Sequence, residues 1–279
     1  MLGLFFAMGA TTLGLAAAPD DAVLTPTRDV TLYQSFFGET ANGSGQHLFC
    51  GVTVRDFNAR RALLRFDLEH AIPPGARITG VELTLHLSRA LEGSPTQIGL
   101  HRVARDWGEG ASDASGQEGA GAEPRPGDAT WVHTFYGTSS WAVPGGDFDS
   151  SELSAASVDG PGTYQWPATP ALVQLAQGWL DKPASNFGII LLADETTNGN
   201  AKRFDSREHP NPGVRPSLRV TFVPRCPADF DGDGFVSGID FDLYVQAFEA
   251  GASSADFDGD GFITGIDFDQ YAQAFEAGC

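Results

Sequence analysis

Basic residues are scarce in this chain. It holds 17 lysines and arginines against 36 aspartates and glutamates, a formal net charge of −19 at pH 7. Nucleic-acid binding requires clustered Lys and Arg to neutralise phosphates, so this balance argues against a nucleic-acid partner. From Cys226 to Cys279 there are ten Asp and two Glu and no Lys or Arg at all. That segment therefore carries −12 of the total net charge of −19. Its carboxylates repel one another, so it needs a bound cation.

Long apolar runs are equally rare. One occurs, Leu2–Ala18, which is uncharged and ends in small residues. This pattern is typical of a secretory signal. We therefore expect a signal peptide over residues 1–18, a secreted or cell-surface protein and no lasting transmembrane segment. The alternative is a retained anchor, because 17 residues lie at the lower limit for spanning a bilayer.

Cysteines are few, at positions 50, 226 and 279. Three cysteines permit three single pairings. We favour a Cys226–Cys279 disulfide that joins the two ends of the acidic segment, with Cys50 a buried free thiol on the same strand face as Leu48 and Val52. Alternatively, the terminal Cys279 pairs between molecules.

Familiar catalytic motifs are missing. No G-x-S-x-G elbow, P-loop or dinucleotide motif occurs, and the six histidines (47, 70, 86, 101, 133 and 209) show no zinc-site spacing. Asp106 and Glu109 flank Trp107, and a carboxylate pair can hydrolyse glycosides, although acidic chains offer such pairs by chance. A polysaccharide-degrading enzyme, either a glycoside hydrolase or a lyase, is therefore an alternative to a non-catalytic protein.

The acidic segment is an internal repeat. Residues 228–251 and 255–278 are identical except at four positions, and each copy is a D-x-D-x-D-G-x5-D loop followed by a short apolar-striped stretch that predicts a helix. Alternate residues of such a tight loop aim oxygens at one point, as a calcium ion with six to eight ligands requires. We expect two calcium ions. The expected ligands are Asp229, Asp231, Asp233, the Phe235 carbonyl, Ser237 and Asp240, then Asp256, Asp258, Asp260, the Phe262 carbonyl, Thr264 and Asp267.

Residues 226–279 resemble a type I dockerin, the paired EF-hand-like calcium module that binds cohesins, and especially short dockerin-like tails that end in Gly-Cys. The resemblance implies a small all-α domain and a cohesin-like or surface-sorting partner. Family contacts with cohesin come from loop positions 10 and 11 and from later basic residues. Here those positions hold Gly238-Ile239 and Gly265-Ile266, and no basic residue follows.

The rest of the chain has the period of β-strands. Val81, Leu83, Leu85 and Leu87 alternate with polar residues, and Gly, Pro, Asn and Asp punctuate short strands from Val23 to Val223. We predict a β-sandwich or jelly roll over residues 23–224, with one helix whose apolar stripe includes Trp179 and a mobile insertion at 108–128.

Ordered phrases in this region resemble the DNRLRE domain, a secreted β-sandwich grouped with carbohydrate-binding modules. They include RRALLRFDL (60–68), RDWGEG (105–110) and RFDSREHPNPGVRPSLRVTF (203–222). The resemblance implies that the protein binds a polysaccharide without cleaving it. A structural or adhesive surface protein is a further alternative.

Five residues are candidates for sugar contacts. Aromatic rings can stack on pyranose faces, and arginines can pair with sugar carboxylates. The alternatives are burial of the rings in the core, and pairing of the arginines with Asp194, Glu195, Asp205 or Glu208. The first three of these acids could instead hold a further calcium ion. The five candidates are Trp131, Tyr136, Trp141, Arg203 and Arg207.

Overall fold

The computed structural model describes residues 19–278 except 56, 92 and 94. The expected signal peptide at 1–18 lies outside the described residues. The chain divides into two compact units, Asp21–Phe222 and a second that begins at Val223. Within the part of the chain that the structure describes, no helix has the length and apolar character needed to cross a membrane. The two units are described separately below.

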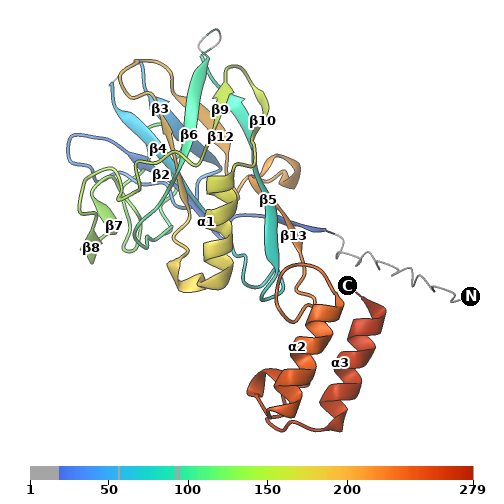
Figure 1. The fold of residues 1–279 in the computed structure, drawn as a ribbon. Coiled ribbons are helices and arrows are strands. Elements are labelled where there is room, and N and C mark those ends of the chain that lie inside the picture. Colours follow the sequence, from blue (N-terminus) through green and yellow to red (C-terminus); the bar gives the residue numbers. More distant parts are fainter. Residues whose placement is uncertain (1–18, 56, 92, 94, 279) are drawn as a thin grey trace, which may run out of the picture. The chain divides into compact units, whose positions relative to one another are not determined.

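The first unit is built on an eleven-stranded antiparallel sheet (Figure 1). Its strand order is β1-β13-β5-β12-β3-β4-β11-β6-β9, with β10 paired to β5 and β2 paired to β4. A separate two-stranded sheet joins β7 and β8. The strands are β1 (Asp20–Leu24), β2 (Arg28–Tyr33), β3 (His47–Val52), β4 (Ala59–Arg65), β5 (Arg77–Arg89), β6 (Thr96–Arg102), β7 (His133–Phe135), β8 (Ser139–Ser140), β9 (Ser154–Val158), β10 (Gly162–Trp166), β11 (Ile189–Ala193), β12 (Lys202–Asp205) and β13 (Ser217–Val223).

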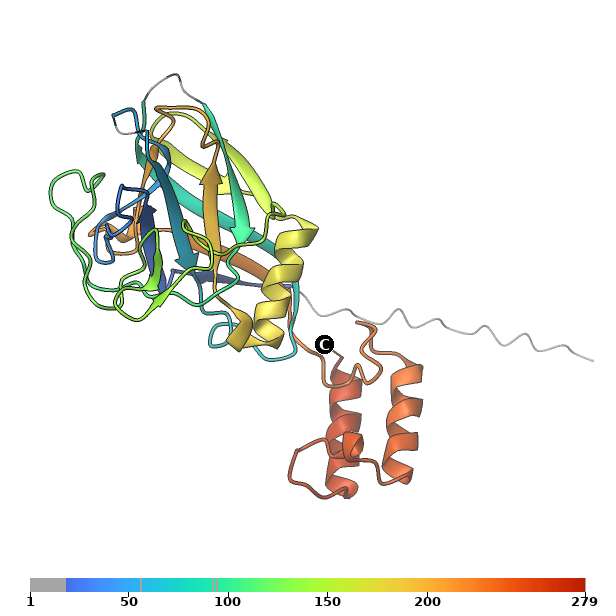
Figure 2. The same ribbon diagram turned by 90° about the vertical axis from the view of Figure 1, so that its left-hand side faces the viewer.

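The sheet curls at β3, which pairs along His47–Cys50 with β12 and along Gly51–Val52 with β4. Figure 2 shows the resulting strongly curved arrangement. The alternation predicted for β5 is confirmed, because its residues switch between buried and half-buried from Val81 to Ser88. The sequence-based prediction of a mainly β fold for this unit is therefore confirmed. The finer assignment to a sandwich is taken up under Proposed function.

One apolar cluster gathers side chains from β3, β4, β5, β6, β11, β12 and β13. Helix α1 (Pro170–Asp181) closes it by packing against β5 (Figures 1 and 2). Pro170 occupies the first helical position and the Thr169 hydroxyl accepts the Leu172 N–H, which together begin the helix. Trp179 is 3% exposed, as expected for a core residue. Short 3-10 turns lie at Pro183–Ser185 and Pro212–Val214.

A second apolar cluster lies on strands β2, β4 and β11. Val30, Leu32, Leu63 and Ile190 meet three tryptophans from the segment between β6 and β9. That segment therefore buries residues that would otherwise face solvent. This double burial explains why β2 is buried almost throughout instead of alternating.

Residues 108–128 are more anchored than their Gly-, Ala- and Ser-rich composition predicts. The Asp128 carboxylate accepts hydrogen bonds from the backbone N–H groups of Ala111, Ser112 and Arg125. The Glu118 carboxylate accepts from the Asn42 side chain and from the His47 N–H. Burial raises the pKa of Glu118, but hydrogen bonds from His47 and Asn42 outweigh it and hold that pKa below its usual value.

The second unit contains α2 (Gly238–Glu249), a 3-10 turn at Ser253–Ala255 and α3 (Gly265–Ala277). Tyr244 and Tyr271 stack between the helices, with ring centroids 3.7 Å apart and an interplanar angle of 7°. The Tyr244 hydroxyl donates to the Ala255 carbonyl, and the Tyr271 hydroxyl donates to the Ala228 carbonyl, each over 3.2 Å. These two bonds are related by the sequence repeat. The paired amphipathic helices predicted from the sequence are thus present, with two tyrosines at their centre.

Candidate metal centre

Each acidic loop brings three carboxylates together. Ligand oxygens of Asp229, Asp231 and Asp240 lie within 4.8 Å of one another, and Asp256, Asp258 and Asp267 do the same in the second loop. These are positions 1, 3 and 12 of the repeated motif. The closing aspartates are buried, with Asp240 0% and Asp267 1% exposed. A buried carboxylate at the end of the loop fixes where the loop turns into the helix.

Backbone N–H groups hold the loop in shape. Asp229 accepts from the N–H groups of Gly232 and Gly234, and Asp240 accepts from those of Phe230 and Asp231. The second loop repeats all four bonds at positions 27 residues later. Gly234 has φ +94°, a left-handed conformation that a side chain would disfavour, so glycine is required at this turn.

The residue expected to serve as the position-9 ligand also caps the following helix. The Ser237 hydroxyl accepts the Ile239 N–H, and Asp240 accepts the Ser237 N–H, which forms a capping box at the start of α2. Thr264 and Asp267 form the same box for α3. Position 12 therefore serves both the loop and the helix N-terminus.

The charge distribution favours a cation at each triad. No Lys or Arg occurs after Arg225 to neutralise these carboxylates. A hydrogen bond from the Asp233 N–H lowers the pKa of Asp231, but lost hydration and three neighbouring carboxylates outweigh it and raise that pKa. Burial raises the pKa of Asp240, but hydrogen bonds from the loop backbone outweigh it and lower that pKa. Clustered oxygens of this kind fit a hard ion such as calcium.

The structure brings together only part of the expected ligand set. Asp233 and Asp260 accept the N–H groups of Phe235 and Phe262 and are not part of the close triads. The rings of Phe235 and Phe262 are exposed, 54% and 70%. Ligation by positions 5, 7 and 9 remains a prediction.

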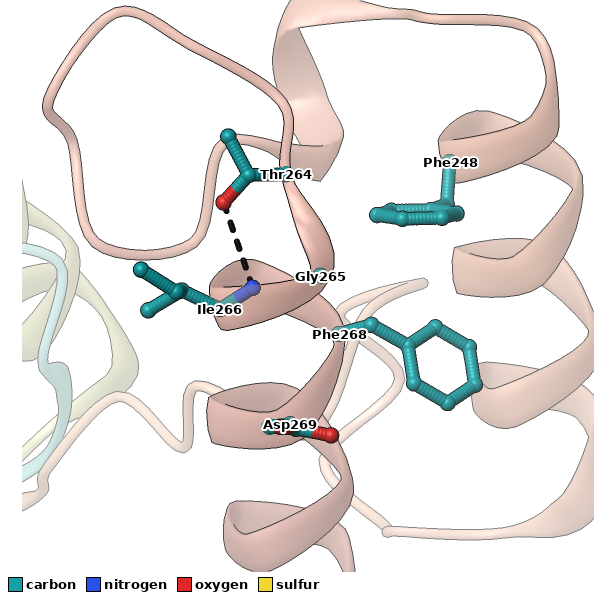
Figure 3. Close-up of a pocket in the computed structure, with 6 residues that line it drawn as sticks. All are labelled: Phe248, Thr264, Gly265, Ile266, Phe268 and Asp269. Atoms are coloured by element: carbon teal, nitrogen blue, oxygen red, sulfur yellow. Dashed lines mark hydrogen bonds between the residues drawn. The ribbon is translucent and has the colours of Figure 1, made fainter.

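An exposed apolar surface lies beside the loops. Ile239 is 62% and Ile266 is 59% exposed, at the positions where the dockerin resemblance places partner contacts. Figure 3 shows the shallow pocket formed by Thr264, Gly265, Ile266 and Asp269 on one helix with Phe248 and Phe268 between the two helices. Apolar side chains left in water at a helix start are suited to contact another protein.

These residues coincide with a known family. Residues 227–276 match the family model of the dockerin type I domain. Such a domain implies calcium binding and a cohesin partner, and dockerin proteins are typically extracellular or cell-surface. Among curated proteins, none matches the chain.

Two of the aromatic candidates in the first unit are buried. Trp131 is 9% and Trp141 is 5% exposed, and both belong to the second apolar cluster. The Arg61 guanidinium covers the Trp131 ring at 4.7 Å, and the Trp141 indole N–H donates to the Thr130 carbonyl. Their faces are therefore closed to a sugar, and the stacking role predicted for them is wrong. Tyr136 is half-buried beside His133.

Arg207 is engaged by acids of its own unit. It pairs in a bidentate manner with Glu109 and also with Glu208 at 2.8 Å. Buried Asp29 accepts the Arg207 N–H, and desolvation together with Glu208 raises the pKa of Asp29. The Arg207 guanidinium is thus paired with two acids, and its backbone N–H with a third. The predicted role in binding sugar carboxylates does not fit this pairing.

Arg203, unlike Arg207, lies beside another arginine, Arg89, and the two share a hydrogen-bond acceptor. Both guanidiniums donate to the side-chain oxygen of Gln117, at 2.7 and 2.9 Å. Desolvation and the charge of Arg89 lower the pKa of Arg203. The two arginines line a cavity of about 430 Å³ whose apolar wall includes Val54 and Leu91. Arg89 and Gln117 could not be recognised from the sequence, since strand pairing brings Arg89 to Arg203 and the loop between β6 and β7 brings Gln117 there.

The other acidic candidates are dispersed. Asp106 pairs with Arg28 and Arg65, and Glu109 with Arg207, so arginines hold both carboxylates of the alternative catalytic pair. The three acids suggested for a further calcium ion also separate. Asp194 accepts from Thr196 and Thr197, Glu195 pairs with Arg61, and Asp205 contacts histidines.

The cysteine predictions have different outcomes. Cys50 is a buried free thiol, as expected, and burial raises its pKa far above the usual value. It is therefore a poor nucleophile. The Cys226–Cys279 disulfide involves Cys279, which lies outside the described residues, and it remains a prediction.

Proposed function

We propose that this chain is an exported, non-catalytic protein that binds a polysaccharide through residues 23–224 and docks through residues 226–279 in a calcium-dependent way. The observation that carries the proposal is the pair of carboxylate triads inside a region that matches the dockerin type I domain. The proposed organisation adds a signal peptide at 1–18, two calcium ions and a Cys226–Cys279 bridge.

The docking partner is a cohesin-like or surface-sorting protein. Ile239 and Ile266 offer exposed apolar contacts, whereas the basic residues that accompany them in the family are missing. The interface should therefore depend on apolar burial more than on charge. Calcium acts indirectly, because it fixes the loops from which both isoleucines project.

Docking is tested with immobilised type I cohesin modules and the full-length chain. We expect binding in calcium that is lost in chelator, and at least about tenfold weaker binding by Ile239→Asp plus Ile266→Asp, since truncating central apolar contacts commonly costs 2 kcal/mol or more. Glu249→Gln plus Glu276→Gln alters both helices away from the loops and serves as the control. Binding that ignores chelator would contradict the docking proposal.

For the first unit we propose a DNRLRE-like sandwich that recognises an acidic sugar. The curled sheet has two halves, with β5, β12 and β13 on one side of β3 and β4, β11 and β6 on the other. Both halves contribute to one apolar cluster, which is the packing expected of a sandwich.

The Arg89–Arg203 cavity supports the choice of ligand. Arginine pairs with a carboxylate through two parallel N–H···O bonds, and Gln117 already occupies the two guanidiniums with an amide oxygen. A uronate carboxylate would replace that oxygen, while Val54 and Leu91 would cover an apolar sugar face. This local grouping of positive charge offsets the overall acidity that otherwise disfavours polyanions.

Polysaccharide binding is tested by affinity electrophoresis of the full-length chain in gels that contain alginate, pectin, xylan or a cellulose derivative. We expect retardation by a uronate polymer without shortening of the polymer. Arg89→Gln plus Arg203→Gln should weaken retardation at least tenfold, because charge-assisted hydrogen bonds contribute about 1.5–3 kcal/mol each. Arg77→Gln, at the opposite end of β5, is the matched control.

The other outcomes of this experiment favour the alternatives. Retardation with depolymerisation would favour an enzyme that degrades polysaccharide. Absence of retardation in every gel, with docking intact, would favour a structural or adhesive surface protein.

A further inference from the structure

Three histidines and two carboxylates meet on the face of the sheet formed by β3, β12 and β5. The Nε2 atoms of His47 and His209 lie 3.7 and 3.9 Å from Asp205 Oδ1. One ligand atom from each of these three residues lies within 4.8 Å of the others. The remaining histidines, 70, 101 and 133, do not belong to this group. Two imidazoles and one carboxylate at these separations form the donor set of a transition-metal site.

Strand pairing creates this group. Asp205 on β12 is the direct partner of His47 on β3, and His209 follows Asp205 by four residues in the turn after β12. His86 comes from the polar face of β5. A site assembled from three separate parts of the chain leaves no spacing motif in the sequence, although each histidine is visible there.

One oxygen of the group lacks a partner. Asp205 is 2% exposed, and its Oδ1 atom has no hydrogen-bond partner among the residues that the structure describes. Leaving a buried carboxylate oxygen unsatisfied costs free energy. The unsatisfied atom is also the one nearest both Nε2 atoms. A bound cation at this point would satisfy it.

The surrounding residues orient the three donors. His86 Nδ1 lies 2.6 Å from Asp205 Oδ2, so that Oδ1 is left facing the other two histidines. Glu118 Oε1 lies 3.1 Å from His47 Nδ1, so this carboxylate faces the nitrogen opposite Nε2, although the contact lacks the angles of a hydrogen bond. Metal-bound histidines commonly present their second nitrogen to a carboxylate, and a small rotation of the ring would complete that bond. Glu118 has φ +62°, a rare conformation for this residue type that marks a constrained position.

We propose that His47, Asp205 and His209 bind one zinc-class divalent ion. A tetrahedral zinc ion with bonds of about 2.0–2.2 Å holds its ligand atoms about 3.3–3.6 Å apart, so the two distances from Asp205 Oδ1 to the imidazole nitrogens need to shorten by about half an ångström. The side chains of His47 and His209 are 14% and 23% exposed, which gives the ion a path to solvent. Three protein ligands leave a position for water or a ligand oxygen. Imidazole donors favour zinc over calcium, which separates this site from the acidic loops.

The proposal is tested by calorimetric titration of the full-length chain with zinc chloride in excess calcium, which keeps the loops saturated. We expect one zinc ion per chain. His209→Ala should weaken zinc binding by about 100-fold or more, and Glu118→Gln by about 10–100-fold, the range for a residue that orients a ligand. His70→Ala removes a histidine that is exposed and remote from the group, and it should leave zinc affinity unchanged.

Cobalt(II) provides a readout that does not depend on a variant. Bound at this site in the unaltered chain, cobalt should give a visible absorption spectrum of low-symmetry coordination, and zinc should abolish that spectrum while calcium leaves it in place. The proposal is overturned by an absence of calcium-resistant zinc binding, by a hydrated-cobalt spectrum, or by equal zinc affinity in His209→Ala and the unaltered chain.

Discussion

Chelation of calcium should unfold residues 227–276 and leave the unit Asp21–Phe222 folded. Three carboxylates converge within 4.8 Å in each loop, and no Lys or Arg after Arg225 opposes their repulsion. The apolar cluster of this unit is small, with Tyr244, Ala255 and Tyr271 as its buried members. A domain of this size depends on bound metal or covalent links for its stability. An ion present at 1,000 times its Kd would add about 4 kcal/mol per site.

The measurement is circular dichroism and heteronuclear NMR with and without chelator. Helical signal should fall in chelator and return with calcium, while resonances of the β-sheet unit persist. Asp229→Asn plus Asp256→Asn should reproduce the loss in calcium. Asp242→Asn plus Asp269→Asn removes the same charge from exposed helix positions and should preserve the calcium response. Helices that persist in chelator would refute the role given to the ions.

Trp107→Ala should be the most destabilising single substitution considered in the first unit. Trp107 is 0% exposed within the second apolar cluster, and its indole N–H donates to the Phe187 carbonyl over 2.8 Å. Truncation of a buried Trp costs about 3–5 kcal/mol. For a unit of this size that loss corresponds to a fall in Tm of roughly 10 °C.

Differential scanning calorimetry of the full-length chain in calcium measures this effect. Trp107→Phe is the matched variant, because it keeps most of the apolar volume and removes the hydrogen bond together with a smaller part of the ring. Its expected cost is about 1–3 kcal/mol, from the unsatisfied Phe187 carbonyl. A Tm for Trp107→Ala within 2 °C of the unaltered chain would show that the segment carrying Trp107 does not stabilise the sheet.

The acidic loops could be read from the sequence because their determinants are local. Asp229, Asp231 and Asp240 lie within twelve residues, so their spacing alone fixes which oxygens can converge. The alternation of buried and half-buried residues along β5 could also be predicted, because it too depends only on neighbouring residues. Even here the pattern missed the capping role of Ser237, since one hydroxyl can serve either a loop or a helix start.

The tryptophans show where sequence reasoning fails. Trp131 and Trp141 lie among Thr, Ser and Gly, a composition that fits an exposed binding surface as well as a loop folded over a sheet. Their burial depends on Val30, Leu32 and Ile190, which come from distant strands. The residues of the proposed zinc site escaped sequence analysis for the same reason. His47 and Asp205 meet because their strands pair in that register, and not because of their spacing in the sequence.

The two tyrosine hydrogen bonds make the calcium loops interdependent. Tyr271 of the second repeat holds the carbonyl of Ala228, the residue before the first loop, and Tyr244 of the first repeat holds the carbonyl of Ala255, the residue before the second. We therefore expect an ion that orders one loop to align the entrance of the other. The half-loaded species should then be disfavoured, and calcium saturation should follow a sigmoidal curve. In that case the docking surface proposed above would respond to calcium at a threshold concentration and not in proportion to it.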